Sequence, residues 1–177
     1  MAERMSPLAQ CQPVAGLAHR ACAMLRQYHA WPEHYAQMAQ ALAAHCGLPE
    51  APQPGKAARG VTASLLRVHP QRLWLIADHA STGDHPQINL DTGAVLDLTH
   101  ARTIIHVGEP IAVSLLSRFI AIDLRPDRFA LDGVALMPIH RVGVVLWRRT
   151  EGFDILVPRS FACSTWDVLA EAAQRLG

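Results

Sequence analysis

The apolar residues of this chain lie in short runs separated by turn residues, and this spacing limits the folds available to it. Strand-like runs recur between residues 63 and 157, with glycine, proline or polar residues between them. Such runs suit strands joined by short connections. Only three segments show the wider apolar spacing of an amphipathic helix. We therefore expect an α+β fold with mostly antiparallel sheets and three main helices.

The expected strands are short apolar or alternating runs bounded by turn residues. They are Ala21–Tyr28, Ala63–Val68, Leu73–Ala77, Val95–Leu98, Thr103–Val107, Val134–Met137, Ile139–Trp147 and Phe153–Val157. Pro70 lies between the second and third of these, which is typical of a hairpin. In the fifth strand, Thr103, Ile105 and Val107 share one face.

Each expected helix begins at a residue that suits a helix N-terminus. Pro32 begins a helix over 32–46, and Gly47 ends it. Pro110 begins the second helix, and Ser160 caps the third. The buried stripes are Tyr35, Met38, Leu42 and Cys46 in the first helix, Ala112, Leu115, Leu116 and Phe119 in the second, and Phe161, Val168, Leu169 and Ala172 in the third.

The remaining segments suggest a simple domain organisation. Residues 1–20 show no clear period, so we expect a loosely ordered N-terminal segment. Residues 21–177 suit a single domain, with a possible subdivision at the proline-rich stretch near 50–60.

Composition excludes several classes of protein. The chain of 177 residues is 50% apolar and 18% charged, which excludes intrinsic disorder. Its net charge of +1 favours neither nucleic acid nor an anionic membrane as a partner. The apolar runs are too short to span a bilayer, and residues 1–11 lack a signal-peptide pattern. Lys56 is the only lysine, which is typical of a GC-rich bacterial genome. We expect a cytoplasmic protein with reduced thiols.

The histidines and cysteines do not show the spacing of a metal site. His34 and His45 are eleven positions apart, and His69, His79 and His85 lie in or near loops. The four cysteines include no C-x-x-C pair. Because zinc needs several ligands that converge, we expect core or solvated histidines and no metal site.

Nucleophilic and nucleotide-binding motifs are also missing from the sequence. Cys46 falls on a buried helix stripe, and Cys163 lies at the third position of a helix with no partner base indicated. The sequence has no G-x-S-x-G, no G-x-G-x-x-G and no P-loop around Gly55-Lys56. We therefore expect no catalytic, cofactor-binding or metal-ligating residue in this chain.

One helix start has the chemistry of an anion contact. Arg159 precedes Ser160 at the expected N-terminus of the last helix, where free N–H groups and a guanidinium can hold a carboxylate or phosphate. The ordinary interpretation, a serine cap beside a surface arginine, is favoured. Arg148-Arg149 is interpreted as a solvated strand end. The four tryptophans, Trp31, Trp74, Trp147 and Trp166, are interpreted as core residues more readily than as interface residues.

Several stretches resemble the gamma subunit of heterotetrameric sarcosine oxidase. The run Phe153–Ala162, followed by Trp166, is similar to the family's F-D-L-Y-V-P-R-S-F-A ending, with Leu156 in place of tyrosine. The weaker matches, in order, are Pro70–Leu75, Asp97–His100 with Arg102, Val107–Pro110 and Val142–Val144. Ala101 stands where the family has glycine.

The resemblance implies a fold distantly similar to the folate-binding domain of the glycine-cleavage aminomethyltransferase. It also implies a complex that demethylates sarcosine to glycine and passes the one-carbon unit to tetrahydrofolate, or releases formaldehyde. FAD, FMN, NAD and tetrahydrofolate would belong to the alpha and beta subunits. This chain would be a non-catalytic companion packed against alpha. Arg159, Ser160, His100 and Arg102 are then candidate contacts to a partner or an anion.

Two other functions remain open on the sequence. One is a stand-alone folate-binding or one-carbon transfer protein, and the other is a small-carboxylate-binding protein that uses Arg159. The departures at Leu156 and Ala101 also allow a different N-methyl amino acid as substrate of the complex. If the high apolar content reflects a subunit interface, the isolated monomer exposes an apolar patch of more than a few hundred Å².

Overall fold

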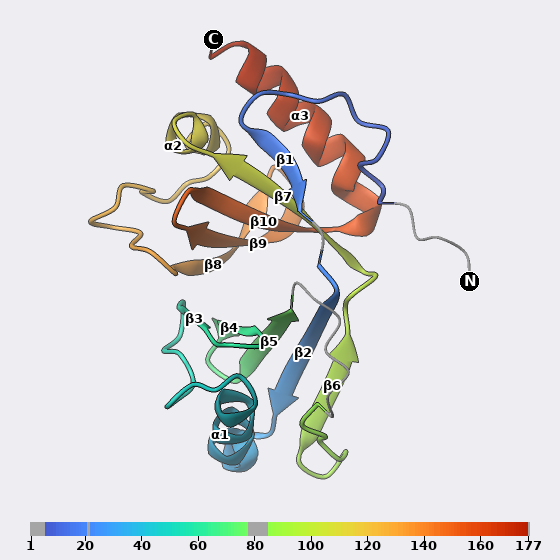
Figure 1. The fold of residues 1–177 in the computed structure, drawn as a ribbon, viewed down its shortest axis with the longest axis vertical. Coiled ribbons are helices and arrows are strands. Elements are labelled where there is room, and N and C mark those ends of the chain that lie inside the picture. Colours follow the sequence, from blue (N-terminus) through green and yellow to red (C-terminus); the bar gives the residue numbers. More distant parts are fainter. Residues whose placement is uncertain (1–5, 21, 78–84, 177) are drawn as a thin grey trace. The chain divides into compact units, whose positions relative to one another are not determined.

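The computed structural model describes residues 6–20, 22–77 and 85–176. These residues divide into two compact units, each built around one five-stranded sheet (Figure 1). The first unit contains residues 6–20, 101–131 and 136–176, and the second contains 22–77, 85–100 and 132–135. Both sheets are antiparallel in every strand pair whose register is known, and three α-helices accompany them. The expected α+β class is confirmed.

The sheet of the first unit has the order β1-β7-β10-β9-β8. Its strands are β1 (Leu17–Arg20), β7 (Arg102–Gly108), β8 (Val134–Ile139), β9 (Val142–Arg149) and β10 (Gly152–Pro158). Helices α2 (Ala112–Leu116) and α3 (Ala162–Gln174) lie on one side of this sheet (Figure 1). The central strand β10 pairs with β7 and β9, so it is hydrogen-bonded along both edges.

Strand alternation produces the core of the first unit. Ile105 and Val107 of β7 are fully buried and share a cluster with Phe153 and Ile155 of β10 and with Leu169 of α3. Side chains two positions apart in a strand point to the same face, so one face of each strand meets the helices. Of the expected common face, Ile105 and Val107 lie in this cluster, and Thr103 is buried as well.

The sheet of the second unit has the order β3-β4-β5-β2-β6. Its strands are β2 (Met24–Ala30), β3 (Ala57–Arg59), β4 (Ser64–His69), β5 (Arg72–Ala77) and β6 (Gly93–Asp97). Helix α1 (Tyr35–His45) packs through Met38, Leu42 and the following Cys46 against this sheet. A 3-10 turn over Pro32–His34 precedes α1, and Gly47 follows it with a φ of +71°, as a helix-ending glycine does.

The N-terminal segment is more ordered than expected. Leu17–Arg20 forms β1 and pairs with β7 in a register that aligns Leu17 with Val107. The expectation of a loosely ordered segment over 1–20 is therefore wrong for these residues. The strand was missed because it is short, and its only buried residue is Leu17. The boundaries between the units also do not fall at 50–60, where a subdivision was considered.

The second and third helices begin later than expected. Pro110 lies in a turn before α2, which ends at Leu116, so Phe119 packs from beyond the helix. A 3-10 turn over Arg159–Phe161 precedes α3, and Ser160 lies inside this turn. The residue at the N-cap of α3 is Phe161, without a side-chain cap. The expected Ser160 cap is wrong because the chain leaves β10 through Pro158 into a tighter turn.

Two aromatic side chains expected in the core are exposed. Trp147, Trp74 and Trp166 are buried, whereas Trp31 is 42% exposed. Phe161, expected on the buried stripe of the last helix, is 48% exposed. Both precede the helix proper, in or beside a 3-10 turn, so the helical spacing that placed Phe161 on a buried stripe does not apply to it.

Candidate functional site

The structure brings three of the four expected contact residues together at one end of the first unit's sheet. Arg102 begins β7 directly opposite Pro158, which ends β10. The backbone N–H of the next residue, Arg159, donates to the carbonyl of Ala101 at 2.9 Å. The 3-10 turn therefore holds Arg159 and Ser160 beside the start of β7, with both side chains exposed.

Arg102 is half-buried and serves the sheet itself. Its guanidinium donates to the carbonyl oxygen of Gly143 in β9 at 3.3 Å, and burial lowers the pKa of Arg102. This side chain thus spans from β7 to β9 instead of extending into solvent. Arg159 places an exposed positive charge at this end of the sheet.

His100 belongs to the second unit and has different neighbours. It is exposed in the turn after β6. Hydrogen bonds from Thr99 are the main cause of the lowered pKa of Asp97, and the charges of Arg26 and His100 lower it further. His100 is therefore part of the turn that ends β6.

The strongest electrostatic feature of the first unit is a fully buried carboxylate that the sequence analysis missed. Asp154 of β10 lies directly opposite His106 of β7, whose Nδ1 is 2.8 Å from its Oδ1. The guanidinium of Arg20, from β1, donates to Oδ2 of the same carboxylate. Arg149 of β9 lies 3.5 Å from that oxygen. We call these four residues the Asp154 cluster.

The Asp154 cluster joins four neighbouring strands through one carboxylate. Asp154 has no exposed surface, whereas the side chains of Arg20, His106 and Arg149 are 21–25% exposed. A buried carboxylate is tolerated only where charged partners replace its hydration. A sequence signal did exist, because Asp154 is the only charged residue in the buried run of β10. Its partners, however, come from strands distant in the chain.

The arginine pair expected at a solvated strand end is instead partly buried. Arg149 stacks over the Trp147 ring at 3.9 Å. Arg148 lies over the Phe153 ring at 5.0 Å and donates to the carbonyl of Leu124 at 2.7 Å. The expectation was wrong because adjacent strand residues point to opposite faces, and both faces here carry aromatic rings.

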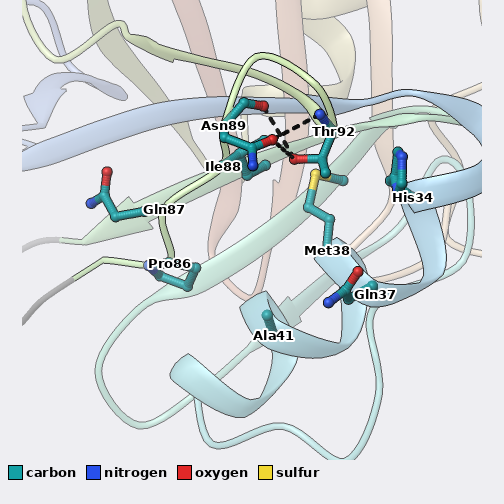
Figure 2. Close-up of a pocket in the computed structure, with 9 residues that line it drawn as sticks. All are labelled: His34, Gln37, Met38, Ala41, Pro86, Gln87, Ile88, Asn89 and Thr92. Atoms are coloured by element: carbon teal, nitrogen blue, oxygen red, sulfur yellow. Dashed lines mark hydrogen bonds between the residues drawn. The ribbon is translucent and has the colours of Figure 1, made fainter.

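A surface cavity of about 250 Å³ lies in the second unit, between α1 and the loop before β6 (Figure 2). Met38 of α1 extends toward Ile88 and Thr92 of the loop, and the Asn89 side chain accepts hydrogen bonds from Thr92 (Figure 2). The lining residues are His34, Gln37, Met38, Ala41, Pro86, Gln87, Ile88, Asn89 and Thr92. Amides, the Thr92 hydroxyl and the His34 imidazole supply its polar groups, so the cavity offers several hydrogen-bonding partners.

Cys46, one of the two thiol candidates, is fully buried in the core of the second unit. Burial raises the pKa of Cys46 to about 11, so this thiol stays protonated at neutral pH. Among residues 6–20, 22–77 and 85–176, no group of three or more His, Cys, Asp or Glu side chains could hold a metal ion. His79 lies outside the described residues. None of the described helices is long and apolar enough to cross a membrane.

Comparison with solved structures identifies a similar chain in an enzyme complex. It belongs to heterotetrameric sarcosine oxidase from Corynebacterium sp. U-96, solved in complex with pyrrole 2-carboxylate. The match has a TM-score of 0.80 and 26% sequence identity, and it covers 97% of this chain and 95% of that one. No family model and no curated protein matches the chain. The chain therefore has the fold of a sarcosine oxidase subunit.

Proposed function

We propose that this chain, which has a sarcosine oxidase subunit-like fold, is the small gamma-type subunit of a flavin-dependent N-methyl amino acid oxidase. In this role the chain is a non-catalytic structural companion of larger subunits. The complex oxidatively demethylates sarcosine, or a related N-methyl amino acid, to the free amino acid. It transfers the one-carbon unit to tetrahydrofolate.

The observation that carries this proposal is the extent of the structural match. The aligned region is nearly the whole of both chains, so the two chains have nearly the same length. A chain of this size corresponds to a small subunit of a complex and not to a large flavoprotein subunit. The ordered motifs from Pro70 to Trp166 agree with the gamma subunit in particular.

The burial and pairing of Asp154 support a structural role for the Asp154 cluster in the first unit. Its carboxylate is fully buried and is paired with Arg20, His106 and Arg149. An acid or base that acts on a substrate must reach the substrate by a hydrogen bond. The Asp154 carboxylate instead joins the sheet together, as expected of a subunit whose chemistry takes place in its partners.

The proposal assigns FAD, FMN, NAD and tetrahydrofolate to the partner subunits. This chain lacks the glycine-rich sequences that cradle a dinucleotide or a nucleoside phosphate. The 3-10 turn over Arg159–Phe161 supplies the contact that we assign to a partner. It presents an exposed guanidinium beside an aromatic ring that is 48% exposed, and both residue types are enriched at protein interfaces.

Affinity purification from the native host tests the proposal. We expect the tagged chain to recover larger subunits, bound flavin visible by absorbance, and sarcosine-dependent oxygen consumption. The isolated chain should show no such oxidation. Recovery of the chain without flavoprotein partners would contradict the proposal. In that case, calorimetric binding of tetrahydrofolate by the isolated chain would support the stand-alone folate-binding protein instead.

Substitution in the 3-10 turn tests the assigned contact. The double variant Arg159→Ala/Phe161→Ala should weaken assembly about tenfold, because removal of an arginine and an aromatic anchor costs at least about 1.4 kcal/mol. Arg175→Ala is the matched control, since Arg175 is exposed near the other end of α3 and pairs with Glu171. Equal assembly of both variants, measured by sedimentation velocity, would exclude this turn as a contact.

A further inference from the structure

Two cysteines that are far apart in the sequence lie side by side in the first unit. Cys11 ends a turn in which its own backbone N–H donates a hydrogen bond to the carbonyl oxygen of Leu8 at 3.1 Å. Cys163 is the second residue of α3, and its thiol donates to the carbonyl of Pro7 at 3.2 Å. One turn further along α3, the Trp166 indole donates to the carbonyl of Gln12 at 3.3 Å. These bonds hold residues 7–12 along the first turns of α3.

The two thiols lie on facing segments, residues 7–12 and the start of α3, and they differ in exposure. Cys163 is exposed, whereas Cys11 is partly buried. Burial raises the pKa of Cys11, and the charge of Cys163 and a hydrogen bond to it raise this pKa further, with a smaller contribution from Asp167. Cys11 therefore remains a thiol beside a more accessible sulfur.

We propose that Cys11 and Cys163 form a reversible disulfide when the protein meets a hydroperoxide. The bond covalently links the N-terminal segment to α3. This modification does not depend on the proposed function, because both sulfurs and the contacts that align them belong to this chain.

The reaction takes two steps with hydrogen peroxide as the oxidant. The Cys163 thiolate attacks one peroxide oxygen and becomes a sulfenic acid, and the released hydroxide takes up a proton to form water. The Cys11 sulfur then attacks the sulfenic sulfur, the S–S bond forms, and a second water leaves. The two thiols lose two electrons in total, and peroxide gains them. A dithiol reductant reverses the reaction by thiol–disulfide exchange.

The other two cysteines have surroundings that do not favour this reaction. Cys46 is fully buried, and burial raises its pKa to about 11. Cys22 belongs to the second unit, where its thiol donates to the carbonyl of Met24 at 3.0 Å. We therefore expect selective oxidation of the Cys11–Cys163 pair in the folded chain.

Peptide mapping of the full chain tests the proposal. The purified protein, in its complex if one forms, is exposed to hydrogen peroxide, blocked with N-ethylmaleimide, unfolded and digested with trypsin. Cleavage after arginine and lysine places each cysteine on its own peptide: 5–20, 21–26, 27–56 and 160–175. We expect the 5–20 and 160–175 peptides to appear linked, with two hydrogens fewer than their sum, and to separate after dithiothreitol.

Three results would overturn the proposal. They are a Cys163 oxidised to sulfinic acid with Cys11 still free, a linked peptide that contains Cys22 or Cys46, and the absence of any oxidation at either sulfur. Cys22→Ser serves as the matched control and should leave the linked peptide unchanged, whereas Cys11→Ser should abolish it. Because the mapping uses the unsubstituted chain, the proposal stays testable even if Cys11→Ser does not fold.

Discussion

At the residue scale, Asp154 shows most clearly how the tertiary structure gives a side chain its role. In the sequence it is one acidic residue in an otherwise apolar run. In the structure it is fully buried, and its nearest polar partners are Arg20, His106 and Arg149 on three other strands. Two guanidinium groups and an imidazole surround a single carboxylate, so removal of its charge takes away an ionic partner that both arginines share.

Asp154→Asn should therefore destabilise the chain strongly. The substitution keeps the shape of the side chain but removes the charge that neutralises two partly buried arginines. Loss of one partner of a buried ion pair costs about 3–5 kcal/mol. Urea unfolding followed by circular dichroism measures the loss.

Asp123→Asn is the control for this prediction. Asp123 also pairs with an arginine, Arg125, but the pair lies at the surface and links neighbouring residues. Surface ion pairs contribute little to stability, so its unfolding curve should match that of the unsubstituted chain. If the two variants gave the same unfolding curve, the buried Asp154 carboxylate would contribute no more to stability than the surface carboxylate of Asp123.

At the element scale, β10 depends on a glycine at its first residue. Gly152 has a φ of +135°, which side chains of L-residues rarely adopt. A Cβ atom there would lie 2.0 Å from the carbonyl oxygen of Val107 in β7. The close approach of these two backbones begins the pairing between β10 and β7. The sequence analysis placed Gly152 just before the expected strand Phe153–Val157, but this approach between strands was not visible in it.

Gly152→Ala should disrupt the first unit's sheet, while Gly143→Ala should not. Alanine at 152 forces β10 away from β7, which we expect to cost about 3 kcal/mol or more. Gly143 lies in β9 of the same sheet and has no atom within 4 Å of an added Cβ. Its alanine variant should remain within about 0.5 kcal/mol of the original chain. Thermal unfolding of both variants measures the difference, and a Gly152→Ala chain of unchanged stability would contradict the assigned role.

At the scale of the whole molecule, exposed apolar side chains and a small net charge occur together. Large apolar residues are exposed in both units: Trp31, Val61, Leu90, Leu96, Ile122, Leu131, Leu136 and Phe161. The net charge is +1, and the isoelectric point is about 7.8. Weak charge repulsion leaves such surfaces free to associate. The single apolar patch expected from the sequence stays a prediction.

The isolated chain should self-associate most strongly near pH 7.8 and least near pH 6. Below the isoelectric point of about 7.8 the net positive charge of the chain rises, which increases repulsion between copies. Static light scattering at the two pH values checks this. Val61→Ser/Leu90→Ser should reduce the scattering at pH 7.8, because both side chains are more than 80% exposed. Scattering that does not change with pH would rule out charge repulsion as the controlling force.

The sequence by itself determined the α+β class, most strand positions, the hairpin at Pro70 and the first helix with its buried stripe. These features depend on periodicity and turn residues, which are properties of neighbours in the chain. The tertiary structure alone decided the pairing of strands that are not joined by a short turn. The strands Gly93–Asp97 and Arg102–Gly108 follow one another yet enter different sheets. It alone also placed Arg20 against Asp154, 134 positions away. Burial and charge neutralisation act between residues that meet only when the chain is folded, so no local pattern reveals them.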